Sequence, residues 1–263
     1  MSKCFDQRLP IVFGLCLALA ACGGEKAYQK SDEALGLEPE ASPAELYVKM
    51  AEEYYKRGQT EVAFRRAQQA IEADDKYPRA QIWLAFLLEE LRQPDEASKH
   101  YERAVKLAPN NSDILNAYAS FLCKQRKYAE ADTYFAKATE NPVYTTPWIA
   151  MTNAGNCAVD AGNTTKAETY YRSAMQANAA FGAPLVKLAE LAMKRGDAKT
   201  AKDYIDRYFK PETARTASVS YTALEVGAQA ERKLGNRKRA AYYEKVLAAN
   251  YPQTPKTSRP AGN

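Results

Sequence analysis

The chain has 263 residues, of which 46% are hydrophobic and 26% are charged, so it holds enough apolar material for a core of one or two domains. Its formal net charge of +5 falls to about +4 once residues 1–21 are set aside, and acidic and basic residues alternate without long blocks. This composition argues against an intrinsically disordered chain, and the charge is too small to predict a nucleic-acid partner.

Residues 1–21 are predicted to be a signal peptide that takes no part in the fold. Lys3 and Arg8 give a basic start, and an apolar run follows at residues 11–21. That run is too short for a membrane span, which needs roughly 20 apolar residues. A basic start, a short apolar stretch and small residues before a cleavage site are typical of an export signal.

The segment Leu-Ala-Ala-Cys-Gly at residues 19–23 resembles the bacterial lipobox. The resemblance implies cleavage after Ala21, a diacylglyceryl group on the thiol of Cys22, and acylation of the new amino terminus, with palmitate among the acyl groups. Each buried methylene of such chains is worth about 0.8 kcal/mol of membrane binding. Gly23, in place of an aspartate, is expected to permit passage to the outer membrane. The alternative is ordinary cleavage that leaves Cys22 as a free thiol.

After a predicted lipidated tether at residues 22–42, the sequence repeats from residue 43 to residue 252. Segments that begin at Asp95 and Ala129 align with an offset of 34 residues. Extending the alignment gives six units, each with an alanine where two helices must approach closely: Ala63, Ala97, Ala131, Ala167, Ala201 and Ala240. Four units place a glycine at the corner, where the left-handed conformation ends a helix: Gly58, Gly162, Gly196 and Gly235.

This pattern resembles the tetratricopeptide repeat, a helix-turn-helix unit of about 34 residues. The last unit departs from it, because Glu244 stands where an aromatic residue is usual. Each unit can bury its apolar face only against its neighbours. We therefore expect an all-α fold, a right-handed superhelix or solenoid of six tetratricopeptide units over residues 43–252. Residues 253–263 are expected to be a disordered tail.

The sequence offers little for catalysis. His100 is the single histidine, so neither a histidine-based metal cluster nor a Ser/His/Asp triad can be assembled. We expect no enzymatic activity, no metal and no cofactor. A basic group in the last unit has two interpretations, contact with anionic headgroups or cell-wall polymers and a merely solvated end of the solenoid: Arg232, Lys233, Arg237, Lys238 and Arg239.

Two cysteines remain beyond the export signal and the lipobox. Cys123 and Cys157 are 34 residues apart, one repeat length, on the first helices of units three and four. Neighbouring first helices pack side by side, and an exported compartment permits oxidation. We predict a disulfide between them, with a pair of small buried thiols as the alternative.

The first helices of such a solenoid line a concave surface that suits extended or helical peptide segments. Counting outward from the core positions of units one and two predicts an apolar docking patch of Val48, Tyr55, Ile82 and Phe86. Two other interpretations stay open, a tether that folds back over these residues and a partial role in the core. Farther along, the surface is predicted to become polar, with Asn116 and Asn156 as further partner-binding residues.

Residues 115–163 contain "FLC", an aromatic-rich "P-x-Y-x-x-P" linker and "NAG-x-C". These motifs resemble the type IV pilus biogenesis and stability lipoproteins of the PilF/PilW family, and the resemblance extends from the lipobox to the closing "NYP". It implies a pilotin, a lipid-anchored, periplasm-facing outer-membrane protein that helps the pilus secretin to localise and form its multimer. Expected partners are that secretin, the outer membrane and other pilus assembly proteins, with no nucleic acid and a monomeric chain.

One rival interpretation belongs to another class of scaffold. A repeat lipoprotein of outer-membrane protein assembly or of cell-wall synthesis would share the anchor and the solenoid. The departures from the family pattern lie mainly in the terminal units, so the binding residues proposed there remain open.

Overall fold

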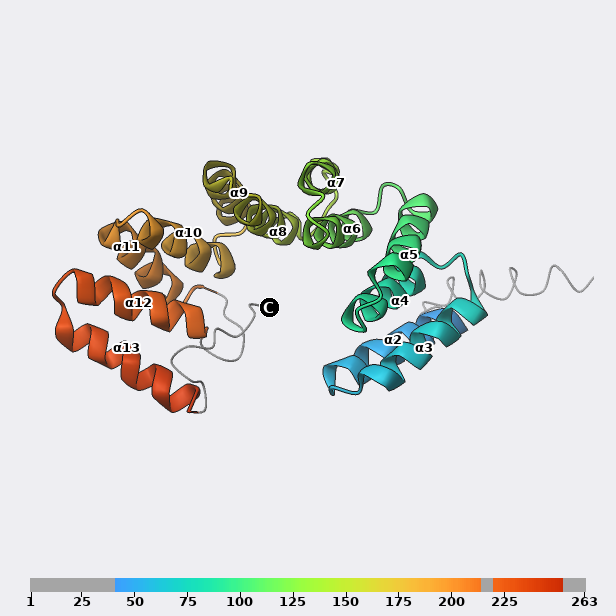
Figure 1. Cartoon of the computed structure of the whole chain (residues 1–263), viewed down its shortest axis with the longest axis horizontal. Coiled ribbons are helices and arrows are strands. Elements are labelled where there is room, and N and C mark those ends of the chain that lie inside the picture. Colours follow the sequence, from blue (N-terminus) through green and yellow to red (C-terminus); the bar gives the residue numbers. More distant parts are fainter. Residues whose placement is uncertain (1–40, 214–219, 253–263) are drawn as a thin grey trace, which may run out of the picture. The chain divides into compact units, whose positions relative to one another are not determined.

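The computed structural model describes residues 41–213 and 220–252, and within them the chain forms twelve α-helices and no strand (Figure 1). All twelve belong to one compact unit that begins at Pro43. Their bounds are α2 Pro43–Lys56, α3 Thr60–Ala73, α4 Pro78–Glu90, α5 Pro94–Leu107, α6 Ser112–Lys124, α7 Tyr128–Glu140, α8 Pro147–Asp160, α9 Thr164–Ala177, α10 Ala183–Lys194, α11 Ala198–Tyr208, α12 Tyr221–Lys233 and α13 Arg237–Asn250. None of these twelve helices combines the length and the hydropathy that a bilayer crossing requires.

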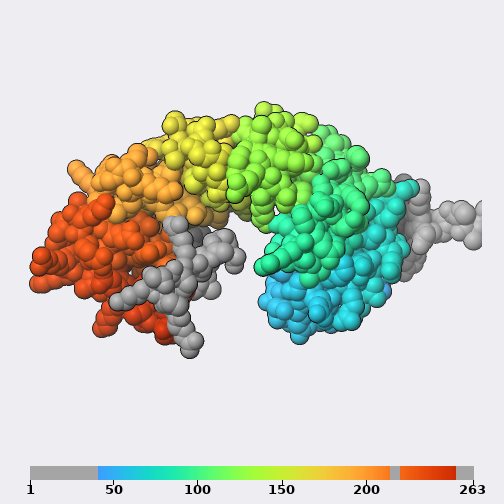
Figure 2. All heavy atoms as spheres, in the orientation of Figure 1, coloured from blue at the N-terminus to red at the C-terminus, as the bar shows by residue number. Residues whose placement is uncertain are grey.

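The helices pack as six consecutive pairs. The most extensive contacts join α2 to α3, α4 to α5, α6 to α7, α8 to α9, α10 to α11 and α12 to α13. Each second helix also contacts the first helix of the next pair, and in Figure 2 the pairs follow one another in chain order. First helices touch one another as well, as α2 touches α4 and α6 touches α8. This arrangement confirms the predicted all-α solenoid of six tetratricopeptide units.

The turn inside each pair requires a residue with positive φ. Gly58, Gly162, Gly196 and Gly235 have φ between +74° and +83°, as the corner position predicts. Units two and three make the same turn without glycine, with Arg92 at φ +60° and Arg126 at +59°. A side chain in this region costs roughly 1–2 kcal/mol, so these two turns depend on the packing of the helices on either side.

The core follows the spacing of the repeat. Each of the six marker alanines is buried between the two helices of its unit. One turn later on the second helix a large ring fills the space, as Phe135 does in unit three and Tyr171 in unit four. In the last unit Tyr243, one position before the exposed Glu244, is the buried ring, and it stacks on Phe209 with centroids 5.5 Å apart.

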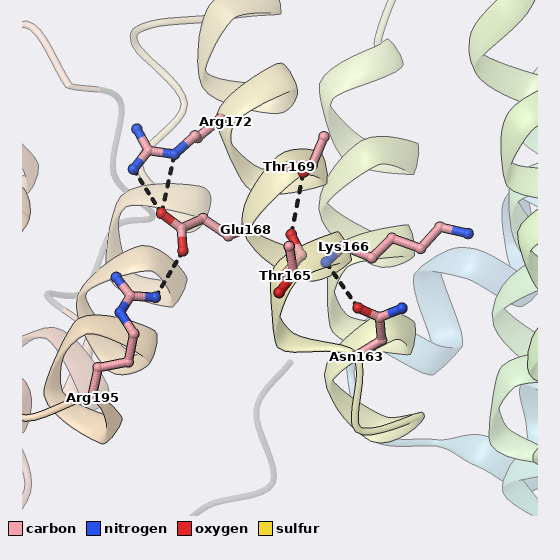
Figure 3. A network of polar contacts seen from close by, with 7 residues as sticks. All are labelled: Asn163, Thr165, Lys166, Glu168, Thr169, Arg172 and Arg195. Atoms are coloured by element: carbon pink, nitrogen blue, oxygen red, sulfur yellow. Dashed lines mark hydrogen bonds and ion pairs between the residues drawn. The ribbon is translucent and has the colours of Figure 1, made fainter.

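Ion pairs recur between neighbouring units. Arg79 pairs with Glu52, Lys124 with Glu89, Lys166 with Asp132, Arg195 with Glu168, and Arg239 with Asp206. Figure 3 shows one of them, in which Glu168 of α9 accepts hydrogen bonds from Arg172 of its own helix and from Arg195 after α10, both at 2.7 Å. The Arg172 hydrogen bond and the charge of Arg195 hold the pKa of Glu168 below its ordinary value.

Several predicted segments lie outside the described residues. They are the signal peptide at 1–21, the lipidation site Cys22, all of the tether except residues 41 and 42, and the tail at 253–263. The connection between α11 and α12 also includes residues outside the described part, at 214–219. It is longer than the other connections between units, as the spacing of the marker alanines predicts.

Candidate partner-binding site

Three aromatic side chains from the first helices of units one and two form a cluster at the surface. Tyr55 lies in the last turn of α2, and Trp83 and Phe86 lie on α4. The Tyr55 ring meets Phe86 edge-on with centroids 4.9 Å apart, and Trp83 meets Phe86 at 5.6 Å and Tyr55 at 6.3 Å. All three rings are half-buried, so each offers part of its apolar surface to a partner. We call these three residues the aromatic cluster.

Carboxylates border the aromatic cluster. The Tyr55 hydroxyl donates a hydrogen bond to Oε2 of Glu90, 3.2 Å away. Burial, followed by the charge of Glu90, raises the pKa of Tyr55, so this hydroxyl stays protonated at neutral pH. Glu52 and Glu89 are each paired with a basic side chain, whereas no ion pair with Glu90 occurs among the described residues. The site is therefore apolar with one unneutralised negative charge at its border.

The predicted docking patch needs one correction and one addition. The sequence predicts Val48 on the surface, but the side chain is completely buried against Ala70 and Ala80, so this prediction is wrong. The neighbouring helices α3 and α4 pack over this part of α2 and cover Val48. Ile82 is half-buried and packs against the core, as Phe86 does. The sequence-based prediction does not include Trp83. Its position next to Ile82 on α4 is the signal that could have assigned it to the docking patch.

The two predicted asparagines lie farther along the first helices, where Asn116 takes part in a polar seam between α6 and α8 and Asn156 contacts α9 of its own unit. The amide of Asn153 donates to Oδ1 of Asn116 at 3.1 Å. The hydroxyl of the buried Tyr171 donates to Oδ1 of Asn156 at 2.8 Å. Both asparagines are half-buried. Their carbonyl oxygens thus serve the packing of units three and four, and only part of each side chain can face a partner.

The cysteine pair lies at the same seam. The structure joins Cys123 of α6 to Cys157 of α8 in a disulfide with an S–S distance of 2.20 Å and a Cα–Cα distance of 5.7 Å. Both side chains are buried. The bridge therefore connects the first helices of units three and four, the two helices that the repeat spacing predicts to be neighbours.

His100 has a structural setting in unit two. Its Nδ1 lies 2.7 Å from Oε1 of Gln81, whose amide in turn donates to the backbone oxygen of Asp75 at 2.7 Å. Within residues 41–213 and 220–252, no cluster of three or more His, Cys, Asp or Glu side chains has the arrangement of a metal site. The chemistry that these residues offer is the docking of another chain, by apolar contact and a few polar groups.

Comparison with known proteins agrees with this reading of the fold. The tetratricopeptide repeat family matches residues 78–121 and 122–183. The chain is 25% identical over 247 residues to the type IV pilus assembly protein PilF of Pseudomonas aeruginosa, covering 93% of this chain and 94% of PilF.

Two solved structures share the fold. The crystal structure of PilW, described as a widely conserved type IV pilus biogenesis factor, has a TM-score of 0.68 at 28% identity and covers 80% of this chain and 94% of its own. The structure of Pseudomonas aeruginosa PilF has a TM-score of 0.67 at 23% identity, with 81% and 93% covered. The chain is thus a tetratricopeptide repeat protein homologous to PilF and similar in structure to PilW.

Proposed function

We propose that this protein is a non-catalytic pilotin that promotes outer-membrane localisation and multimer assembly of the type IV pilus secretin. The observation that carries the proposal is the homology to a type IV pilus assembly protein along 93% of the chain. A pilotin needs an anchor, a surface that holds the secretin and a scaffold that keeps the two connected. A solenoid of stacked units provides such a scaffold without catalysis.

The aromatic cluster is the surface that we assign to the secretin segment. Half-buried rings offer large contact areas with little loss of side-chain entropy on binding, and such rings dominate the binding energy of many interfaces. Glu90 at the border favours a partner with a basic side chain beside its apolar residues. The partner segment that fits is therefore short, apolar and basic at one position.

We further propose that a lipid on Cys22 anchors the protein in the outer membrane. The lipobox-like residues 19–23 support lipidation, and Gly23 supports transfer to the outer membrane. In this arrangement the repeats face the periplasm as a monomer and hold the secretin segment close to the bilayer in which the multimer forms. Other pilus assembly proteins could use the remaining repeat surfaces.

The decisive experiment compares a chromosomal deletion with strains that express either the wild-type chain or Cys22→Ala. Secretin multimers are measured in outer-membrane fractions by gel electrophoresis, and surface pili are counted. We expect the deletion to abolish the multimers, the wild type to restore them, and Cys22→Ala to leave the protein unanchored with few multimers. Normal multimers in the deletion strain would refute the pilotin role. Normal pili with defective envelope growth would instead favour the rival scaffold.

A further inference from the structure

The turn between α12 and α13 concentrates positive charge at the last unit of the solenoid. Residues 231–239 contain five Lys and Arg residues and a single acid, Glu231, which is buried. Arg232 pairs with Glu244, and Arg239 pairs with Asp206 and Glu231. The remaining three basic side chains, Lys233, Arg237 and Lys238, are exposed.

Exposed basic residues without an ion pair among the described residues also occur at earlier turns, as Arg92, Arg126 and Lys194 do, but no earlier turn gathers three of them. Lys124 and Arg195 are neutralised by an acid of the preceding unit, as Arg239 is. Among the described residues, no carboxylate lies within ion-pair distance of Lys233, Arg237 or Lys238. Their charges therefore add to one another and are available to an external anion.

Exposed apolar side chains accompany the charges. Leu234 lies within the turn and is 40% exposed, and Tyr242 lies one helical turn after Lys238 and is 62% exposed. Lys245 follows Tyr242 by three residues on the same side of α13 and is also exposed. Basic side chains that surround a protruding Leu and Tyr have the composition of a surface that rests in the headgroup region of a bilayer.

We propose that this basic turn, defined as Lys233, Leu234, Arg237, Lys238, Tyr242 and Lys245, docks on a bilayer surface that carries anionic phospholipids. The lysines and arginines would contact the phosphates, while Leu234 and Tyr242 enter the interface. A membrane fits better than an acidic peptide, because the apolar residues project from a turn and an exposed helix face. The surface lies on α12 and α13, away from the elements of the aromatic cluster, and does not depend on the proposed pilotin role.

The test uses the full chain with Cys22→Ala in every sample, so that no acyl chain contributes to binding. Sedimentation measures its partition onto vesicles of phosphatidylethanolamine with 30% phosphatidylglycerol, and onto neutral phosphatidylcholine vesicles. The test variant is Lys233→Gln/Arg237→Gln/Lys238→Gln. The matched control, Arg65→Gln/Lys76→Gln/Lys106→Gln, removes three charges that are also exposed and make no ion pair among the described residues. Thermal unfolding confirms that both variants fold.

We expect binding to the anionic vesicles alone, and weaker binding as salt increases. Each basic residue near an anionic surface contributes roughly fivefold, so the test variant should lose about a hundredfold in partition coefficient. The control should lose much less, and Leu234→Ser should lose severalfold. Equal binding to both vesicle types, or equal losses in the two triple variants, would overturn the proposal. Binding to polyglutamate without binding to vesicles would also overturn it and would assign the turn to an acidic protein.

Discussion

Cys123 on α6 and Cys157 on α8 have their Cα atoms 5.7 Å apart, and their disulfide connects two neighbouring units through their first helices. The units of a solenoid are otherwise held by contacts with their nearest neighbours alone. The bridge spans the connection between α7 and α8, which carries Val143, a valine that is 79% exposed. The covalent link thus secures the junction between units three and four, in addition to the packing of the linker residue Tyr144 against the cluster of Leu115, Ala138 and Ala150.

Loss of this bridge should lower the free energy of unfolding by about 3–4 kcal/mol, because the 34-residue loop is no longer closed in the unfolded chain. The comparison is Cys123→Ser/Cys157→Ser against the wild type, by urea unfolding with and without a reducing agent. The reductant should destabilise the wild type and leave the double variant unchanged. Before reduction, an alkylating reagent should modify neither Cys123 nor Cys157, because both sulfur atoms are in the disulfide. Two thiols that react freely in protein recovered from the periplasm would contradict the prediction.

Gly155 of α8 gives Tyr171 the space that it occupies. A Cβ atom at position 155 would lie 2.6 Å from Cδ1 of the Tyr171 ring, closer than real atoms approach. The ring cannot move away easily, because it is buried and its hydroxyl donates to Asn156. We expect Gly155→Ala to lower the free energy of unfolding by about 1–3 kcal/mol, the usual cost of overpacking a core.

The matched control for this substitution is Gly227→Ala. Gly227 is also buried in a first helix, but there the nearest atom, on Tyr243, would be 3.1 Å from the new Cβ. The gain in helix propensity, about 1 kcal/mol, should offset most of that strain. Urea unfolding of both variants gives the comparison, and equal effects would show that the contact with Tyr171 does not limit position 155.

Much of the fold could be predicted from the sequence, because each repeat unit places the same kinds of residue at the same positions. The marker alanines identify the close approach of two helices, and the corner glycines identify the turns, so six units could be placed without a structure. The turns at Arg92 and Arg126 show that position in the repeat outweighs residue type. Spacing of one repeat length also predicted that Cys123 and Cys157 face each other.

The candidate site was less predictable, because exposure depends on the neighbouring unit. Val48 and Tyr55 both lie on α2, but α3 and α4 together bury Val48 completely, whereas Tyr55 is only half-buried. Trp83 belongs to the site although a tryptophan near the core positions would be assigned to the core. Such differences arise from how two helices pack, and a single repeat does not encode that packing.

His100 should make stability depend on pH in the mildly acidic range. Burial lowers its pKa below the ordinary value of 6.5; the charge of Glu96 opposes that shift, and the charge of Lys99 adds to it. The unfolded chain therefore binds the proton more readily than the folded chain does. Stability is fully present above the unfolded pKa and is lost as pH falls through the folded pKa.

The free energy of unfolding should thus decrease as the pH falls from 7.5 to 5. His100 is the single histidine of the chain, so no other imidazole contributes in this range. Urea unfolding across this range measures the slope. His100→Gln keeps a polar partner for Gln81 and should flatten the dependence. A slope that is identical in the variant would assign the pH effect to other groups.

Among the residues of the aromatic cluster, substitution of Phe86 should have the largest effect on partner binding, because its ring contacts both Tyr55 and Trp83. Burying one large apolar side chain in an interface is worth about 1.5–3 kcal/mol, so Phe86→Ala should weaken binding of a purified secretin segment tenfold or more. Tyr55→Phe, which removes only the hydroxyl that donates to Glu90, should have a smaller effect. Phe209→Ala is the matched control, since Phe209 is also half-buried in ring contacts but lies beside Tyr208 and Tyr243. Calorimetric titration gives the affinities, and thermal unfolding separates lost binding from lost folding. If folded Phe86→Ala binds as tightly as the wild type while folded Phe209→Ala does not, the secretin segment docks on the last units instead.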